Sequence, residues 1–193
     1  STREAIDVIR QAKKKGLNIT CDTAPPYFLL NENVLLNYDT SFKISPPLRT
    51  EDDRMAVIEG IQDGTIDAIA SDHRARSKDT KVQPFSAASI GAAGIETLFS
   101  LTLELVHKKL ISLNKAISLI SVNPSKILKI KEPTLELNED ATFIIFDDSF
   151  KSTINQKDLM FSPTPFEGRN IKGHILATFI LGNPSHLDPL LRK

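Results

Sequence analysis

The sequence predicts an α/β fold, in which a parallel sheet built from βα units is followed by a smaller β subdomain. Helical and strand-like segments alternate over the first half of the chain, and this pattern favours parallel strands joined by helical crossovers. A short apolar run at residues 67–71 ends abruptly at Asp72 and His73, as expected of a strand covered on both faces. β-Branched and aromatic runs dominate the last part of the chain, so we divide it into residues 1–132 and a β subdomain at 133–193.

The first elements follow from capping and turn chemistry. Ser1 and Glu4 have the spacing of a capping box, and apolar residues with helical spacing follow them up to a lysine run and Gly16. Residues 17–21 indicate a strand. We expect residues 22–27 to form a loop, because two consecutive prolines cannot extend a central ladder.

The central segment repeats the alternation. Residues 28–38 leave open whether a short helix forms, and residues 43–49 indicate a strand end that passes into a rigid turn. Thr50 and Asp53 have the spacing of a second capping box, which predicts a helix over residues 54–62. The apolar strand described above follows that helix.

Further helices are predicted from Thr97 to about His107 and over residues 113–120. Asn123 is expected to cap one more short helix, with Pro124 at its first position.

In the β subdomain, strands are predicted over residues 141–147, 150–154 and 175–181, and a turn over residues 182–184.

Composition places the chain among ordinary globular proteins. Its 193 residues suffice for one sizeable domain, or for one domain with an appendage. Lys+Arg and Asp+Glu both total 24, so charge does not favour nucleic acid or an anionic membrane as a partner. No apolar run approaches the roughly 20 residues of a membrane span, and the first residues lack the pattern of a signal peptide. A cytoplasmic location is therefore expected, and the single cysteine, Cys21, is expected to lie in the core.

Asp72 is the leading candidate for chemistry. Polar residues just beyond the carboxyl ends of barrel strands face the active site, and Asp72 has this position. A carboxylate there can bind a metal or carry a proton. The alternative is that Asp72 only caps the following turn.

Longer motifs occur in order along the chain, at residues 1–5, 45–54, 63–73, 94–97, 164–168 and 172–173. Together they resemble the C-terminal half of a bacterial dihydroorotase, a member of the amidohydrolase superfamily of cyclic amidohydrolases. Dihydropyrimidinases and allantoinases are the related alternatives. The resemblance implies the C-terminal part of a (β/α)₈ TIM-type barrel of a metal-dependent hydrolase, with a small β subdomain.

The resemblance also implies a reaction, the interconversion of carbamoyl aspartate and dihydroorotate in pyrimidine synthesis. A zinc-activated hydroxide performs this chemistry, and a carboxylate shuttles the proton. Asp72 matches the catalytic base, which is also a metal ligand provided that further ligands exist upstream of residue 1. Ser45, Arg76 and Gly91 match positions that bind the substrate.

Several residues depart from the family pattern. Ser45 replaces an asparagine, and Arg76 replaces a histidine that holds the substrate carboxylate. Arginine can still bind a carboxylate. Pro26 replaces the histidine of a Pro-His-Tyr or Pro-His-His motif, a change that we interpret as lying behind the metal ligands.

A complete barrel needs roughly 250 residues, and only about three barrel strands are predicted here. We therefore expect that the chain is part of a longer protein, or that a partner covers the open side. Its four histidines lack metal-ligand spacing, whereas a catalytic zinc needs about three protein ligands. The 193 residues alone are therefore predicted to bind no zinc and to be inactive.

Two functional hypotheses follow. The chain belongs either to a working zinc-dependent dihydroorotase or to an inactive homologue that assembles with aspartate transcarbamoylase. We favour the second, since Arg74-Ala75-Arg76 replaces the family's loop sequence, including its substrate-contacting histidine. Arg74, Arg76, Lys78 and Lys81 would also make this loop basic, which suits an acidic partner surface. A solvated loop, anion binding without turnover and a homo-oligomer are the remaining alternatives.

Overall fold

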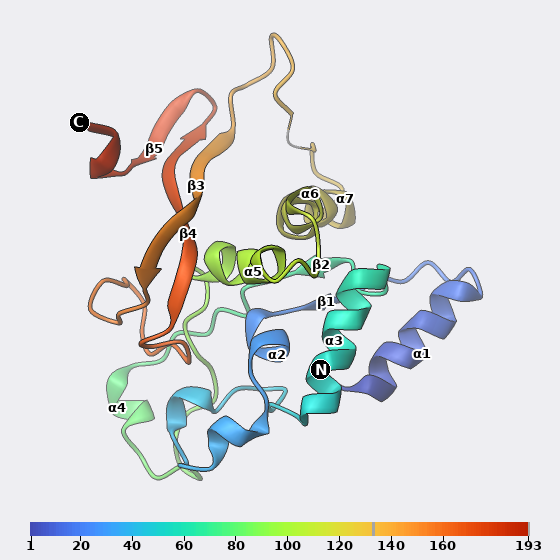
Figure 1. The fold of residues 1–193 in the computed structure, drawn as a ribbon, viewed down its shortest axis with the longest axis vertical. Coiled ribbons are helices and arrows are strands. Elements are labelled where there is room, and N and C mark those ends of the chain that lie inside the picture. The colour runs from blue at the N-terminus through green and yellow to red at the C-terminus, as the bar shows by residue number, and fades with distance from the viewer. Residues whose placement is uncertain (133, 193) are drawn as a thin grey trace.

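The structure, a computed structural model, describes residues 1–132 and 134–192 (Figure 1). The predicted subdomain boundary at residue 133 lies outside the described residues. Two sheets are present in the described part, a parallel pair and an antiparallel sheet of order β3-β4-β5. The strands are β1 (Asp22–Thr23), β2 (Ala68–Ile69), β3 (Phe143–Thr153), β4 (Asn170–Ile180) and β5 (Asn183–Leu187).

Helices cover the parallel pair and continue toward the antiparallel sheet. In Figure 1, α3 lies between α1 and α2, and α5 lies next to β4. The α-helices are α1 (Arg3–Lys14), α2 (Pro25–Leu29), α3 (Glu51–Asp63), α4 (Lys78–Lys81), α5 (Leu98–His107), α6 (Leu113–Ile117) and α7 (Asn123–Leu128). Short 3₁₀ segments at Glu32–Leu35, Thr40–Phe42 and Pro189–Arg192 and a π-helical segment at Ser118–Val122 complete the elements. No described helix combines the length and hydrophobicity that a membrane span requires.

The main core forms where the helices meet the parallel strands. Its fully buried side chains include Phe28 of α2, Ile61 of α3 and Leu105 of α5, and Ile69 of β2 belongs to the same cluster. Cys21, expected in the core, is only partly buried and packs against this cluster, and burial raises the pKa of its thiol. The central strand is thus covered, and its carboxyl end is held in place by buried apolar contacts.

The N-terminus of α1 differs from its prediction. Thr2 is the N-cap, and its hydroxyl accepts a hydrogen bond from the Ala5 amide at 3.2 Å, so the proposed capping box of Ser1 and Glu4 is wrong. The Arg3 amide donates to Asp53 at 2.8 Å, which ties the start of α1 to the start of α3 and fixes the helix one residue later.

The strand predicted at residues 17–21 is also misplaced, because pairing with the β2 segment begins only at Cys21. The Cys21 carbonyl accepts from the Asp67 amide at 2.9 Å, and the strand itself occupies residues 22–23. The two prolines beyond it open α2 instead of forming a loop, since proline is tolerated in the first turn of a helix.

No strand forms at residues 43–49, where the prolines lack the N–H groups that a ladder needs. The next helix is confirmed and longer than predicted. Thr50 and Asp53 form a complete capping box at the start of α3, and Gly64 ends the helix in the left-handed conformation, with φ of 82°.

Two further boundaries were wrong. Residues 113–128 form one continuous helical stretch, because the π-helical turn accommodates Pro124, which has no N–H to donate. Asn123 does not cap a new helix, since its side chain donates to the Asp67 carbonyl at 2.8 Å.

In the antiparallel sheet, β3 replaces two predicted strands with one irregular strand that has two register shifts. The turn before β5 uses Leu181 and Gly182, both with positive φ, so pairing already resumes at Asn183.

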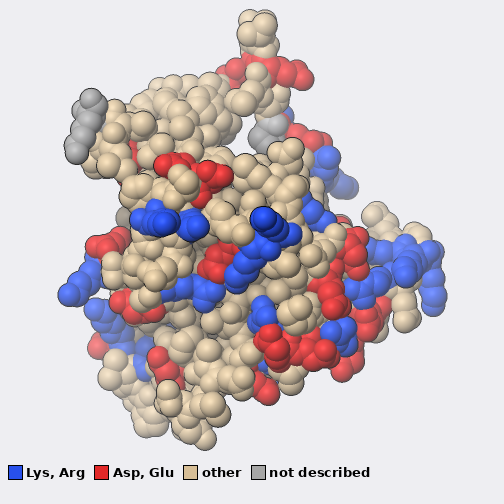
Figure 2. All heavy atoms as spheres, viewed as in Figure 1, with Lys and Arg blue, Asp and Glu red and all other residues tan. Residues whose placement is uncertain are grey.

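The chain leaves much surface open. Its accessible area is 11,495 Å², whereas a compact monomer of 21.4 kDa exposes roughly 9,100 Å². Leu135, Leu137, Ile144, Ile145 and Met160 are among the exposed large apolar side chains. Charges of both signs mix over the face shown in Figure 2, so this excess area does not form one basic or acidic surface there.

An ion pair joins α5 to the start of β4. The Arg169 guanidinium binds the Glu104 carboxylate through two contacts, at 2.6 and 2.8 Å, and the Glu104 side chain is only 13% exposed. Burial raises the pKa of Glu104, but Arg169 and Lys108 outweigh burial and hold this pKa below the ordinary value of 4.5. The pair therefore stabilises the fold above about pH 4.5, and this contribution is lost as pH falls through the lowered pKa.

Arg169→Met is expected to reduce the free energy of unfolding by about 2 kcal/mol at pH 7, because the Glu104 carboxylate loses its charged donor. The difference from wild type should shrink as pH falls below about 4.5 and Glu104 becomes protonated. Denaturant unfolding at pH 7 and over a series of lower pH values measures it, with the exposed Arg49→Met as the control of equal charge. If Arg169→Met and Arg49→Met lowered the free energy of unfolding equally at pH 7, the prediction would be contradicted.

Candidate functional site

The candidate site lies at the carboxyl ends of the two parallel strands. β1 pairs with β2 in parallel register, with Asp22 opposite Ala68, so both strands end at the same edge of the sheet. The residues that follow them share a small cavity. Its lining consists of Pro25, Pro26, Ile44, Ser71, Asp72, Ala92, Ala93, Gly94, Thr97, Leu101, Pro165 and Phe166. The structure thus places Asp72 at the predicted strand-end position, facing a mostly apolar space.

The Asp72 carboxylate is three-quarters buried, with 25% of its side chain exposed. Its backbone has φ of 44°, a left-handed conformation that aspartate tolerates better than most residues. Burial raises the pKa of Asp72, while the Arg74 guanidinium and the neighbouring Tyr27 hydroxyl act in the opposite direction. Arg74 Nε lies 3.4 Å from Asp72 Oδ1, and the Tyr27 hydroxyl donates to the Pro46 carbonyl at 3.0 Å.

His73 has a structural function beside this carboxylate. Its Nδ1 accepts hydrogen bonds from the amides of Gly94 and Ile95, at 3.3 and 3.2 Å, so the proton of the neutral ring is on Nε2. The His73 ring also packs edge to face against the Phe161 ring, with the two ring centroids 4.8 Å apart. His73 therefore joins the strand end to the segment that leads into α5.

The predicted substrate-binding residues lie around the same edge. Ser45 is exposed between Ile44, which lines the cavity, and Pro46, which accepts the hydrogen bond of Tyr27. Arg76 is exposed, and its Nε donates to the Ile90 carbonyl at 2.8 Å. That these side chains contact a substrate remains a prediction.

Gly91 is buried beneath the arginine segment. Its amide donates to the Lys43 carbonyl at 2.9 Å and is therefore engaged within the protein. Its φ is 126°, and a Cβ at this position would lie 2.7 Å from the Arg74 carbonyl oxygen. Glycine is thus required here so that Arg74 can pack against the backbone, and its contact with a substrate remains a prediction.

Two lysines hold the loop that contains Gly91. Lys43 Nζ donates to the carbonyls of Phe85, Ser86 and Ala88 at 2.6, 3.0 and 2.7 Å. Lys81 Nζ binds the Ser89 carbonyl at 3.1 Å. These two ammonium groups satisfy the loop carbonyls, and the backbone beside the site is consequently fixed.

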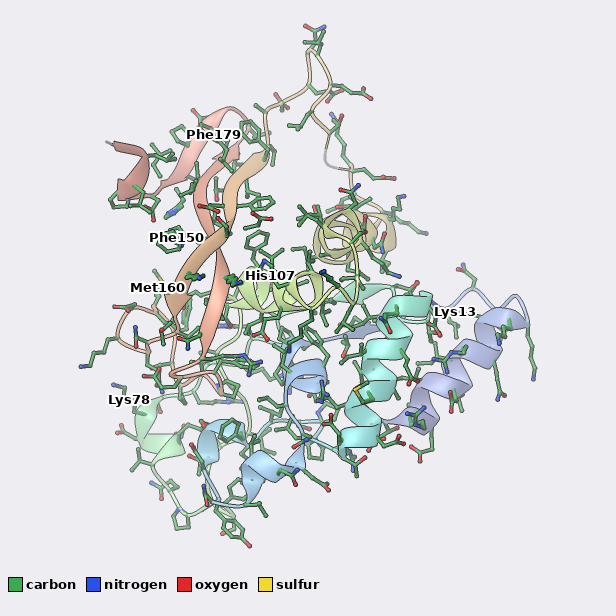
Figure 3. All side chains as sticks on the ribbon, in the orientation of Figure 1. Lys13, Lys78, His107, Phe150, Met160 and Phe179 are labelled. Carbon is green, nitrogen blue, oxygen red and sulfur yellow. The ribbon has the colours of Figure 1, made fainter. Side chains whose placement is uncertain are left out.

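The expectation of a basic surface on this loop is wrong for Lys81, which is only 4% exposed. Burial lowers the pKa of its ammonium, and the nearby Lys43 acts in the same direction. Arg74 faces Asp72, and Arg76 is tied to the backbone. Lys78 remains fully at the surface, on α4 at the periphery of the molecule (Figure 3). A sequence run of four cations therefore does not give four free surface charges.

Pro26 is the site residue whose importance the sequence did not reveal. It stands where the resembled family has a histidine, and we interpreted the change as lying behind the metal ligands. In the structure, Pro26 and Asp72 both line the same cavity, and Pro26 contributes to its apolar wall. The interpretation that this replacement lies behind the metal ligands stays a prediction.

The described residues do not fit a catalytic zinc by themselves. Within residues 1–132 and 134–192, no three metal-binding side chains cluster, whereas such a zinc needs about three protein ligands. The distant histidines are engaged elsewhere: His107 Nε2 lies 3.0 Å from the Asp148 carbonyl, and His174 Nε2 lies 2.6 Å from Asp188 Oδ2. Asp72 is the residue of this chain that could contribute to a metal site completed from outside it.

A strand-end carboxylate on a parallel pair covered by helices, with an antiparallel sheet appended, is the arrangement expected of part of a (β/α)₈ barrel. Comparison with known proteins agrees, since the Amidohydrolase family matches residues 1–184. The chain therefore belongs to the amidohydrolase family, and the predicted resemblance is confirmed.

Its relatives include curated dihydroorotases. The chain is 39% identical over 184 residues to that of Anaplasma phagocytophilum (strain HZ), covering 94% of this chain and 41% of the relative. The dihydroorotase of Desulforapulum autotrophicum is also 39% identical over 184 residues, with 94% and 43% covered. The chain thus spans about two-fifths of the length of the curated relatives that it matches.

Solved structures support the predicted fold. The L-hydantoinase (dihydropyrimidinase) from Arthrobacter aurescens has a TM-score of 0.89 at 23% identity, with 97% of this chain and 43% of that chain covered. The dihydropyrimidinase from Brevibacillus agri NCHU1002 has a TM-score of 0.86 at 25% identity, with the same coverage. The predicted α/β class, part of a TIM-type barrel with a β subdomain, is confirmed.

Proposed function

We propose that this chain is a dihydroorotase-like protein of pyrimidine synthesis whose own site does not turn over a cyclic amide. The observation that carries the proposal is the surroundings of Asp72. Pro26 forms the cavity wall where the resembled family has histidine, and Arg74 lies 3.4 Å from the carboxylate. The similarity to curated dihydroorotases supports the pathway, and these two side chains support the loss of catalysis.

The chemistry explains why these residues matter. A carboxylate that moves a proton between water and a ring nitrogen must be free to accept that proton. The adjacent Arg74 guanidinium favours the charged form of Asp72 and opposes the effect of burial, which raises the pKa of this carboxyl group. A zinc ion would supply an activated water in this family. Asp72 could serve as one ligand of that zinc, and the remaining ligands would come from outside this chain.

A non-catalytic role needs a partner, and we propose an assembly with aspartate transcarbamoylase in the cytoplasm. Association of the chain with a second copy of itself is the alternative.

A second candidate is an active zinc-dependent dihydroorotase whose other ligands come from residues outside this chain. The raised pKa of Asp72 favours it, because a carboxyl group with a pKa moved toward neutrality is better suited to proton transfer. In that enzyme Asp72 would carry the proton, and Arg76 would hold the substrate carboxylate.

The test uses the protein as its gene encodes it, purified without chelator beside the dihydroorotase of Anaplasma phagocytophilum. Zinc per chain is measured by elemental analysis, and hydrolysis of dihydroorotate is followed in both proteins. We expect turnover at least about a thousandfold below that of the comparator, together with capture of aspartate transcarbamoylase in a pull-down. One or two zinc ions per chain and turnover that Asp72→Asn abolishes would establish the second candidate instead.

A further inference from the structure

We propose that a cavity between α5 and the β3–β4 pair binds a small molecule that carries a phosphate dianion. The cavity has a volume of about 460 Å³, within the range of roughly 300–1,000 Å³ that is typical of small-molecule sites. The last turn of α5, which ends at His107, forms one wall, and the two strands form the other (Figure 3). The lining shares no residue with the cavity of Asp72, so the inference goes beyond the proposed function and does not depend on turnover of dihydroorotate.

A pair of lysines on the two strands supplies the positive charge. Lys151 of β3 and Lys172 of β4 are direct partners in the antiparallel register, and both line the cavity. Directly opposed side chains have Cβ atoms roughly 5 Å apart, and like charges at such positions repel each other. Within the described residues, no ion pair includes either lysine. A dianion bound between the two ammonium groups would replace this repulsion with two attractive interactions.

The remaining charges of the cavity are explained by the fold itself. Glu104 is the carboxylate among the described lining residues, and Arg169 binds it through two contacts. Lys108 Nζ lies 3.3 Å from Glu104 Oε2, and Lys108 follows the last residue of α5, where the helix dipole favours a cation. These contacts account for Arg169 and Lys108 but not for the two opposed lysines of the strands.

The next pair along the strands adds neutral polar groups. Thr153 lies opposite Asn170, and the alternation of side chains places both on the same face of the strands as Lys151 and Lys172. The Thr153 hydroxyl donates to Asn170 Oδ1 at 2.8 Å, which leaves the side-chain NH₂ of Asn170 as a donor. A phosphate ester could therefore place its phosphate at the lysines and its hydroxyl-bearing part beside Thr153 and Asn170.

The cavity walls are fixed by contacts between α5 and the strands. A Cβ on Gly173 of β4 would overlap Leu103 Cδ1 of α5, so the strand and the helix pack closely there. The Ser100 hydroxyl donates to the Gly173 carbonyl at 2.8 Å, and His107 Nε2 donates to the Asp148 carbonyl at 3.0 Å. Because these contacts hold the strand pair on the helix, binding would not have to order the walls of the site.

Calorimetric titration of the gene product with inorganic phosphate and with ribose 5-phosphate, at constant ionic strength in sodium chloride, tests the site. Lys151→Gln and Lys172→Gln are the variants, and Lys157→Gln, an exposed lysine of the β subdomain outside the cavity lining, is the matched control. We expect saturable binding with a dissociation constant of about 1 mM or below. Either cavity substitution should weaken it at least about tenfold, and the control less than about twofold. Tighter binding of ribose 5-phosphate than of phosphate would identify an ester as the ligand, and equal binding the free ion.

The thermal unfolding midpoint in phosphate-free chloride buffer provides a second readout. Lys172→Gln should unfold at the same midpoint as wild type or at a higher one, since the repulsion between the lysines is removed. A lower midpoint would show that a carboxylate elsewhere in the whole protein already pairs with Lys172, and would overturn the proposal. Absence of saturable binding, or equal weakening in all three variants, would also overturn it. Tighter binding of a polyglutamate peptide than of ribose 5-phosphate, lost with the same lysines, would assign the pair to an acidic protein surface instead.

Discussion

Truncation of Phe28 to alanine is expected to reduce the free energy of unfolding by about 3–5 kcal/mol. Phe28 is 0% exposed and belongs to the main core cluster. Its removal leaves a cavity among residues of α3 and α5 that can collapse only in part. The helix that carries it, α2, also carries Pro25 and Pro26, so the loss reaches the wall of the Asp72 cavity.

Denaturant unfolding of the gene product measures the effect, and two variants calibrate it. Phe28→Leu keeps most of the volume and should cost less than about 1.5 kcal/mol. Leu36→Ala truncates a side chain that is exposed and should remain within about 0.5 kcal/mol of wild type. If Phe28→Ala were as mild as Leu36→Ala, this part of the core would not be packed as described.

The elements that the sequence predicts well are those with local and redundant evidence. The helix after Thr50 has a capping box, helical periodicity and a terminal glycine, and all three are present in α3. The apolar run before Asp72 predicts a buried strand because its composition suits no exposed element, and the structure confirms the position of Asp72 at its end.

The errors have a common physical cause, namely contacts between residues distant in sequence. The register of β1 is set by hydrogen bonds from Asp67 and Ala70, which a local reading of residues 17–21 does not contain. Pro25 and Pro26 interrupt a strand, but they also open a helix, and tertiary packing decides between these outcomes.

The candidate site depends even more strongly on contacts between residues distant in sequence. A sequence displays the charge of Lys81 but not its burial, and it displays the replacement at Pro26 but not that Pro26 and Asp72 line one cavity. Parallel pairing of β1 with β2 brings their carboxyl ends to one edge, and the meaning of both residues follows only from that pairing.

Gly91→Ala is expected to cost about 3 kcal/mol of stability and to release Arg74 from Asp72. Two effects add: alanine is strained at a φ of 126°, and its Cβ would press on the Arg74 carbonyl at 2.7 Å. Gly16→Ala distinguishes the backbone strain from the steric contact. Gly16 also has positive φ, at 79°, but a Cβ added there would have no atom within 4 Å. That control should cost only about 1 kcal/mol, in the same denaturant assay.

The difference between the two glycine variants therefore measures the contact with Arg74. If Arg74 can pack here only because residue 91 has no side chain, Gly91→Ala should displace the guanidinium. Arg74→Met should then cause little further loss of stability. Equal costs for Gly16→Ala and Gly91→Ala would mean that the loop adapts without strain, and that the position of Arg74 does not depend on the glycine. A larger cost at Gly91, together with loss of the coupling between Arg74 and Asp72, would show that this ion pair depends on the absence of a side chain at residue 91.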